Sequence, residues 1–297
     1  MVAGAPPLDT QTPEENRAGV RAVLPLTGAP TALADVTDTT LPGPGGAIPV
    51  RVYRPSNASQ LPVVAYFHGG GWLLGDLDSH DSTCRDIARY AEAVVVAVHY
   101  RLAPENPFPA AYEDCLAVTK ALLDDSAGLG TDRTRVAIAG DSAGGNLAAG
   151  IAQALRGSSP GLVHQVLIYP LMDARLHPTG SSTQFSEGHF LSRRDLEYFV
   201  NTYAGAADRQ DWRLSPGLAK DLSGLPAATV LTAECDPLRD DGESYAAALR
   251  SASVPVEYRC FEGQVHPFVM LGGIIDAANE ARRLIGEQLR QSFARAP

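Results

Sequence analysis

One serine lies in the setting that nucleophilic catalysis requires. Ser142 stands at the centre of Gly140-Asp141-Ser142-Ala143-Gly144, directly after an apolar run that ends at Ala139. The G-x-S-x-G spacing is typical of a nucleophile elbow, in which a strand turns sharply into a helix, strains the serine and requires small neighbours. The alternative is a glycine-rich turn whose serine caps the next helix. Strand-like residues before Ser142 and helix-like residues after it favour the nucleophile.

A second segment is rich in glycine. His68-Gly69-Gly70-Gly71-Trp72 follows the apolar run from Val63 to Phe67. Consecutive glycines let the backbone approach a ligand and aim its amide hydrogens inward, as an oxyanion hole requires. Phosphate binding is the rival interpretation, but the chain has no G-x-x-x-x-G-K-[ST] pattern and no G-x-G-x-x-G between a strand and a helix. We therefore do not expect a bound nucleotide.

A serine hydroxyl needs a base that takes its proton and a carboxylate that orients the base. Seven histidines compete for the role of base. Six of them lie at strand ends, in helical or loop surroundings, or in an irregular stretch: His68, His80, His99, His164, His177 and His189. When the nucleophile sits in such an elbow, the chain order is serine, acid, histidine, and His266 alone leaves room for an acid after a late strand. Asp236 fits that acid, whereas Asp240 and Asp241 begin a helix and complement its dipole.

Hydrophobic periodicity predicts the elements that position these residues. Short apolar runs predict strands of a parallel sheet that is buried on both faces: Val63 to Phe67, Ala93 to Val98, Val136 to Ala139, Val166 to Tyr169, Ala228 to Thr232 and Val256 to Phe261. Helix-like segments lie between most of them, among them Pro109 to Leu123, Ala143 to Leu155 and Arg239 to Arg250. A last helix would pack on the sheet through one apolar side, formed by Ile274, Ala278, Ala281, Ile285 and Leu289. This alternation predicts an α/β fold.

Two stretches depart from the alternation. Thr12 and Glu15 form a capping box before a helix expected to reach about Leu24, and residues 34–55 then read as an antiparallel edge hairpin. Residues 174–217 carry no strand signal where the next strand is due. Their helical core, residues 193–203, has an apolar stripe and would form a lid over the carboxyl ends of the strands.

Composition excludes several classes of function. The chain has 297 residues and a formal net charge of -10, which would repel nucleic acid and anionic membranes. It contains no apolar run of the roughly 18 residues that a membrane span needs, and because its first residues lack the basic start and apolar stretch of a secretory signal, we do not expect export. Four cysteines without paired spacing predict buried free thiols, neither disulfides nor a zinc site. We expect a cytoplasmic protein with no membrane and no nucleic-acid partner.

With these segments in place, the chain resembles the bacterial hormone-sensitive-lipase-like (family IV) esterases of the α/β-hydrolase superfamily. Four blocks carry the resemblance in order: His68 to Trp72 is similar to the HGGGW motif, residues 100–114 to YRLAPE followed by PFPAA, Gly140 to Gly145 to GDSAGG, and Asp236 to Asp240 to the acid motif. The resemblance implies a single α/β-hydrolase domain over residues 1–297, with a mostly parallel central sheet, helices on both faces and a helical cap formed from about 1–45 and 174–217.

Carried over residue by residue, the resemblance implies catalytic Ser142, Asp236 and His266, with oxyanion donors from the backbone of Gly70, Gly71 and Ala143. His68, Glu105 and Asp114 would shape the glycine loop. Pro267 departs from the glycine that often follows the histidine in this family, and it biases His266 towards extended dihedral angles.

The implied activity is a serine carboxylesterase that hydrolyses short- to medium-chain acyl esters through an acyl-enzyme, with no metal or organic cofactor. An amidase, lactonase or carbamate hydrolase would use the same triad, and a ligand-binding member of the fold, like the gibberellin receptor, would lack it. The pocket walls would include Trp72, Phe190, Tyr198 and Phe199, although aromatic stripes on helices also serve packing. A homodimer through the exposed edge of the last strand remains an open expectation.

Overall fold

The computed structural model describes residues 6–296, and its centre is one eight-stranded sheet with strand order β1-β2-β4-β3-β5-β6-β7-β8. The strands, in chain order, are β1 (Asp35–Gly43), β2 (Gly46–Arg54), β3 (Val63–Phe67), β4 (Val94–Val98), β5 (Val136–Asp141), β6 (Leu162–Ile168), β7 (Ala227–Cys235) and β8 (Val256–Val265). β1 and β2 pair antiparallel as an edge hairpin, and β2 pairs antiparallel with β4, whereas β3 to β8 run parallel. The predicted α/β fold with a mostly parallel sheet is confirmed.

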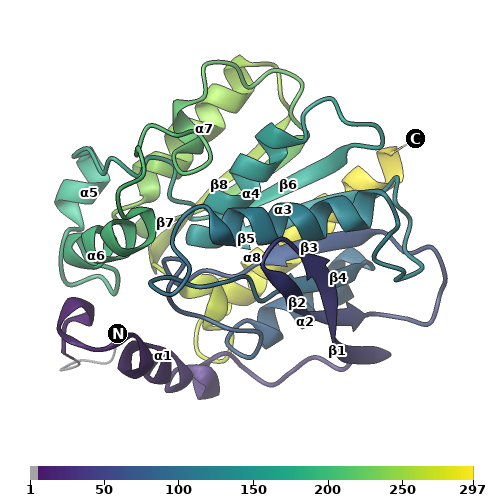
Figure 1. The fold of residues 1–297 in the computed structure, drawn as a ribbon, viewed down its shortest axis with the longest axis horizontal. Coiled ribbons are helices and arrows are strands. Elements are labelled where there is room, and N and C mark those ends of the chain that lie inside the picture. Colours follow the sequence, from purple (N-terminus) through teal and green to yellow (C-terminus); the bar gives the residue numbers. More distant parts are fainter. Residues whose placement is uncertain (1–5, 297) are drawn as a thin grey trace.

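Helices cover both faces of this sheet (Figure 1). On one face lie α3 (Ala110–Leu123), α4 (Ala143–Ala154) and α7 (Arg239–Ser251), and on the other lie α2 (Asp81–Ala91) and α8 (Asp276–Arg295). The residues of β3, β4 and β5 are all buried, because both of their sides meet a helical layer. Their continuous apolar runs follow from this burial.

Two segments form a helical cap at one end of the molecule (Figure 1). The N-terminal segment contains α1 (Pro13–Arg21) and the 3₁₀ turns η1 (Leu8–Thr10) and η2 (Leu24–Leu26). The inserted segment contains α5 (Gly180–Gln184), α6 (Arg193–Ala204) and the turn η3 (Pro216–Leu218). The predicted apolar stripe of α6 is buried, and an ion pair of 2.9 Å between Arg194 and Asp9 joins the two segments.

Three expected boundaries differ from the structure. α1 ends at Arg21, short of Leu24, because the chain tightens there: the Ala22 and Val23 amides donate three residues back, to Gly19 O and Val20 O, and the 3₁₀ turn η2 follows. The N-terminal part of the cap stops before residue 35, since β1 belongs to the sheet, and the expected residues 1–5 lie outside the described residues. Ile274 precedes α8 and is 61 % exposed, so it does not belong to the apolar side of that helix.

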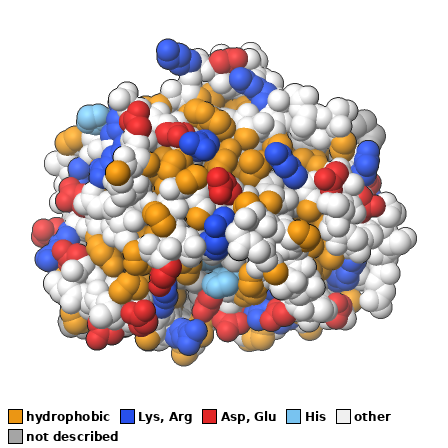
Figure 2. All heavy atoms as spheres, viewed as in Figure 1, with side chains coloured by type: hydrophobic (Ala, Val, Ile, Leu, Met, Phe, Trp, Pro, Cys, Tyr) orange, Lys and Arg blue, Asp and Glu red, His pale blue; other side chains and the backbone are white. Residues whose placement is uncertain are grey.

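The surface charges and the cysteines of the described residues do not indicate another class of function. Acidic and basic side chains are interspersed over the face shown in Figure 2. Within residues 6–296, no helix combines the length and the apolar character needed to cross a bilayer. All four cysteines are free thiols, but only Cys84 and Cys115 are buried, while Cys235 and Cys260 are half-buried.

Candidate active site

The nucleophile elbow is built by β5 and α4. Ser142 joins them with φ 55° and ψ -118°, backbone angles that residues other than glycine rarely adopt. Its amide donates to Ile168 O at 2.8 Å. A Cβ on Gly140 would lie 2.3 Å from Gly144 O, and one on Gly144 would lie 1.9 Å from Phe67 O. Only glycine fits at both positions, which explains the spacing of the motif.

His266 connects the serine to an aspartate. Its Nε2 lies 2.9 Å from Ser142 Oγ, and its Nδ1 lies 2.8 Å from Asp236 Oδ2. Asp236 is fully buried, and its other carboxylate oxygen accepts the Leu238 amide at 2.8 Å. When Nδ1 carries the ring proton and donates a hydrogen bond to Asp236, Nε2 is free to accept the serine proton. The three side chains therefore have the geometry for activating a hydroxyl.

The glycine loop lies beside this serine. Gly70 and Gly71 have φ of 111° and 61°, and a Cβ on Gly71 would lie 2.2 Å from the Phe199 ring of the cap. Ala143 begins α4, where an amide has no acceptor within the helix. All three residues line the same cavity as Ser142 and His266. The residues predicted as oxyanion donors therefore border the same space as Ser142 and His266.

The expected structural role of His68 agrees with its surroundings. Its Nδ1 lies 2.8 Å from Gly69 O, and its ring stacks on Tyr100 with centroids 4.3 Å apart. Burial, with His80 nearby, lowers the pKa of His68 to about 3. His68 is therefore neutral near pH 7 and supports the glycine loop without a charge.

Asp141 ties the elbow to the glycine loop, a link that the sequence reasoning missed. One of its carboxylate oxygens accepts the Gly69 amide at 3.0 Å and the Tyr66 hydroxyl at 2.8 Å. His80 Nε2 lies 3.2 Å from the same carboxylate. Burial opposes ionisation of Asp141, but His80 and the hydrogen bonds outweigh it and hold the pKa of Asp141 below its usual value. The position of an aspartate directly before Ser142 was the available signal.

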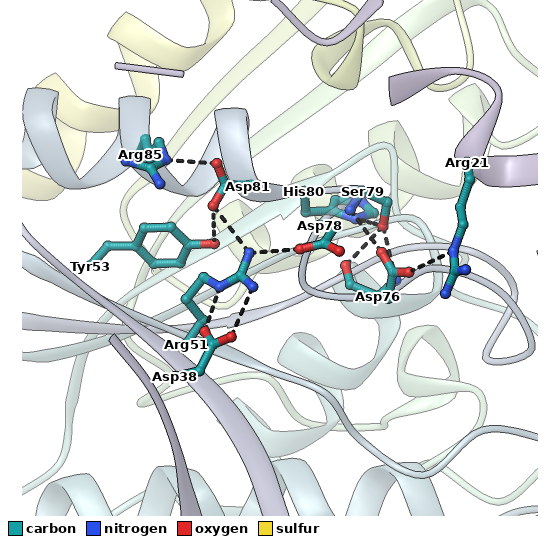
Figure 3. Close-up of polar contacts among 10 residues, drawn as sticks. All are labelled: Arg21, Asp38, Arg51, Tyr53, Asp76, Asp78, Ser79, His80, Asp81 and Arg85. Atoms are coloured by element: carbon teal, nitrogen blue, oxygen red, sulfur yellow. Dashed lines mark hydrogen bonds and ion pairs between the residues drawn. The ribbon is translucent and has the colours of Figure 1, made fainter. Parts of the chain in front are cut away.

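Figure 3 shows the polar contacts that hold His80 and the residues around it. Ser79 Oγ lies 3.0 Å from His80 Nδ1, and the Asp76 side chain accepts the Ser79 amide at 2.8 Å. In the same view, Arg51 of β2 bridges three carboxylates around the start of α2, those of Asp38, Asp78 and Asp81. This network fixes the start of α2 and hence the segment that carries His80.

The cavity beside Ser142 has a volume of about 290 Å³ and a mainly apolar lining. Among the predicted wall residues, Trp72, Phe190 and Phe199 line it. Tyr198 is not among its lining residues, and its hydroxyl lies 3.5 Å from Asn16 Nδ2 of α1. The helical stripe predicted the burial of α6 but not which of two adjacent aromatic rings faces the cavity.

Further residues line the cavity that were not among the predicted wall residues: Leu8, Val20, Leu171, Leu196 and Met270. α1 is held over the cavity by Arg17, whose guanidinium pairs with Glu105 at 2.7 Å and also donates to Leu73 O and Ala103 O. Glu105 therefore anchors the cap, in contrast to the expected role in the glycine loop. Asp114 instead pairs with Arg101 at 2.8 Å.

Asp240 and Asp241 do more than complement the dipole of α7. Asp240 accepts the Ser181 amide of α5 at 2.8 Å, so that α7 holds the cap. Asp241 accepts the amides of Met172 and Asp173 at 2.9 Å and 3.2 Å. Burial raises the pKa of Asp241 to about 6 despite these two hydrogen bonds.

Comparison with known proteins agrees with this arrangement. Residues 64–270 match a family model described as alpha/beta hydrolase fold. LipN, a carboxylic ester hydrolase of Mycobacterium tuberculosis, is 44 % identical over 89 % of this chain and 73 % of its own. An ethyl acetate hydrolase of Pseudomonas putida is 40 % identical over 88 % of this chain and 83 % of its own.

Among solved structures, the thermostable carboxylesterase EstE1 from a metagenomic library superposes with a TM-score of 0.91. It is 40 % identical, and the match covers 96 % of this chain and 99 % of that one. The fold, the motifs and these relatives indicate the same family. The chain belongs to the α/β-hydrolase family, in the hormone-sensitive-lipase-like group that its sequence motifs predicted.

Proposed function

We propose that this protein hydrolyses carboxylic esters, with Ser142 as nucleophile, His266 as general base and acid, and Asp236 as the carboxylate that orients the histidine. The main support is the continuous hydrogen bonding from Asp236 through His266 to Ser142, at 2.8 Å and 2.9 Å, on the wall of an apolar cavity. The ester-hydrolysing relatives support the same reaction class.

In the first half of the reaction, Ser142 Oγ attacks the carbonyl carbon of the ester while His266 Nε2 takes the hydroxyl proton. The carbonyl oxygen becomes an oxyanion that accepts hydrogen bonds from the amides of Gly70, Gly71 and Ala143. When the intermediate collapses, the bond to the alcohol oxygen breaks and His266 gives its proton to that oxygen. Asp236 stabilises the imidazolium between these two steps.

In the second half, water replaces the alcohol. His266 Nε2 takes a proton from the water as its oxygen attacks the acyl carbon, and the same amides hold the new oxyanion. Collapse breaks the bond to Ser142 Oγ, which receives the proton from His266, and the carboxylic acid departs. This sequence consumes one water for each ester and requires no cofactor.

The substitution Ser142→Ala tests the proposal. We expect kcat/KM for p-nitrophenyl butyrate to fall by at least about 10³-fold, because the nucleophile is lost while the fold persists. Ser59→Ala is the matched control, since Ser59 is an exposed serine. Substantial turnover by a folded Ser142→Ala protein would refute the proposal.

We further propose short- to medium-chain acyl esters as substrates. The cavity of about 290 Å³ lies just below the roughly 300–1,000 Å³ typical of ligand pockets, and the cap covers it. A series of p-nitrophenyl esters from acetate to palmitate measures this directly. We expect higher kcat/KM from acetate to hexanoate than for palmitate, and a maximum at palmitate would contradict the proposed chain-length range.

A further inference from the structure

Arg282 of α8 is a buried arginine outside the cavity. Its side chain is 1 % exposed, and its guanidinium pairs with Asp86 Oδ2 of α2 at 2.8 Å and donates to Ser82 Oγ at 3.1 Å. α2 and α8 lie against each other on one face of the sheet (Figure 1). Since an apolar contact between two helices is often as stable as a buried ion pair, packing alone does not account for this arginine.

The same guanidinium also reaches the loop that carries His266. Nε donates to Val269 O and Nη2 donates to Met270 O, both at 3.0 Å. These carbonyls end the 3₁₀ turn η4 (Phe268–Met270), which begins two residues after His266. Carbonyls at the end of a helical turn lack partners within it. Arg282 therefore fixes the backbone of this turn to α8 and, through Asp86, to α2.

Asp86 and Ser82 of α2 also bind the segment that leads from the cap to the sheet, at Thr27 and Thr31. Asp86 Oδ1 accepts the Thr31 hydroxyl at 2.5 Å, and Ser82 Oγ donates to Thr27 O at 2.9 Å. The end of the histidine loop joins this chain too, because the Gly273 amide donates to Leu26 O at 3.0 Å. The histidine loop is thus held between α8, α2 and the segment that follows the cap helix.

We propose that Arg282 is a positioning residue for ester hydrolysis, which keeps His266 in line with Ser142 by fixing the carbonyls of Val269 and Met270. The inference rests on the proposed function. Arg282 does not line the cavity, so it acts through the loop and not on the substrate. A planar guanidinium donates in three directions at once here, whereas the compact ammonium of lysine cannot hold two carbonyls and a carboxylate in this arrangement.

The double variant Arg282→Met with Asp86→Leu tests the proposal. Replacing both partners leaves no unpaired buried charge, so we expect a folded protein. Because the carbonyls lose their donors, we expect kcat for p-nitrophenyl butyrate to fall on the order of 10- to 100-fold while KM stays within about twofold. kcat is expressed per active site, counted by the burst of p-nitrophenol from diethyl p-nitrophenyl phosphate. A folded double variant with the wild-type kcat per site overturns the proposal.

Two further variants complete the test. Arg290→Met is the matched control, because Arg290 of α8 pairs with Glu92, the residue that caps the end of α2, at 3.3 Å, but it is exposed and makes no hydrogen bond to the described residues of the histidine loop. We expect it to keep the wild-type kcat. If the double variant does not fold, Arg282→Lys decides: a lower kcat at unchanged KM supports positioning, and the wild-type kcat in folded protein overturns it. If Ser142→Ala abolishes turnover while the folded Arg282 variants keep the wild-type kcat, the positioning proposal fails and the proposed function stands.

Discussion

At the scale of residues, Ser142 holds a backbone conformation that its own side chain disfavours. Its φ of 55° persists because β5, α4 and the Ile168 carbonyl surround the turn. The motif predicted this turn and its glycines, since their reason is local and steric. The links of Asp141 to Gly69 and His80 could not be predicted in this way, because those residues are far apart in the chain and meet only when the sheet forms.

A prediction follows for Gly144, which touches the backbone of β3. In Gly144→Ala the added methyl would lie 1.9 Å from Phe67 O, so β3 and the first turn of α4 must move apart. We expect the free energy of unfolding in urea to fall by about 1–3 kcal/mol, with loss of ester hydrolysis. Gly19→Ala is the control, since no atom lies within 4 Å of its added methyl, and it should be neutral or stabilising by about 0.4–1 kcal/mol. Equal stability of the two variants would contradict this account.

At the scale of elements, periodicity predicted the sheet and most of its helices well, because buried parallel strands must be apolar on both sides. It was less informative for the cap. Periodicity placed α6 and the start of α1, but the contacts that hold α1 over the cavity run from Arg17 to Glu105, Leu73 and Ala103, and they are electrostatic. No spacing within α1 encodes such partners. The stripe of α6 likewise does not tell which of two adjacent aromatic rings faces the cavity, and Phe199 lines it whereas Tyr198, also expected in the wall, does not.

At the scale of the whole molecule, buried histidines connect stability to pH. His164 lies between the Thr229 and Ser292 hydroxyls, both at 2.8 Å, and burial lowers its pKa to about 4. The unfolded chain binds a proton at this histidine below about pH 6.5, whereas the folded protein stays neutral there until about pH 4. The fold therefore loses stability as the pH falls through this window.

The substitution His164→Gln isolates that contribution, because glutamine keeps hydrogen-bonding groups but does not titrate. We expect the wild type to lose about 3 kcal/mol more than the variant between about pH 7 and pH 4, as measured by urea unfolding. His68, which shares the direction of the shift, remains in both proteins and cancels in the difference. Parallel stability curves for the two proteins would show that His164 is not the group responsible.

The central claim is that Ser142, activated by His266, is the residue that attacks the substrate. Labelling with diethyl p-nitrophenyl phosphate, followed by peptide mass spectrometry, tests it most directly. We predict a single phosphoryl adduct on the peptide that contains Ser142, formed at the same rate as ester hydrolysis is lost, and no adduct in His266→Ala. Complete inhibition with Ser142 unmodified, or full activity with Ser142 modified, would contradict the claim.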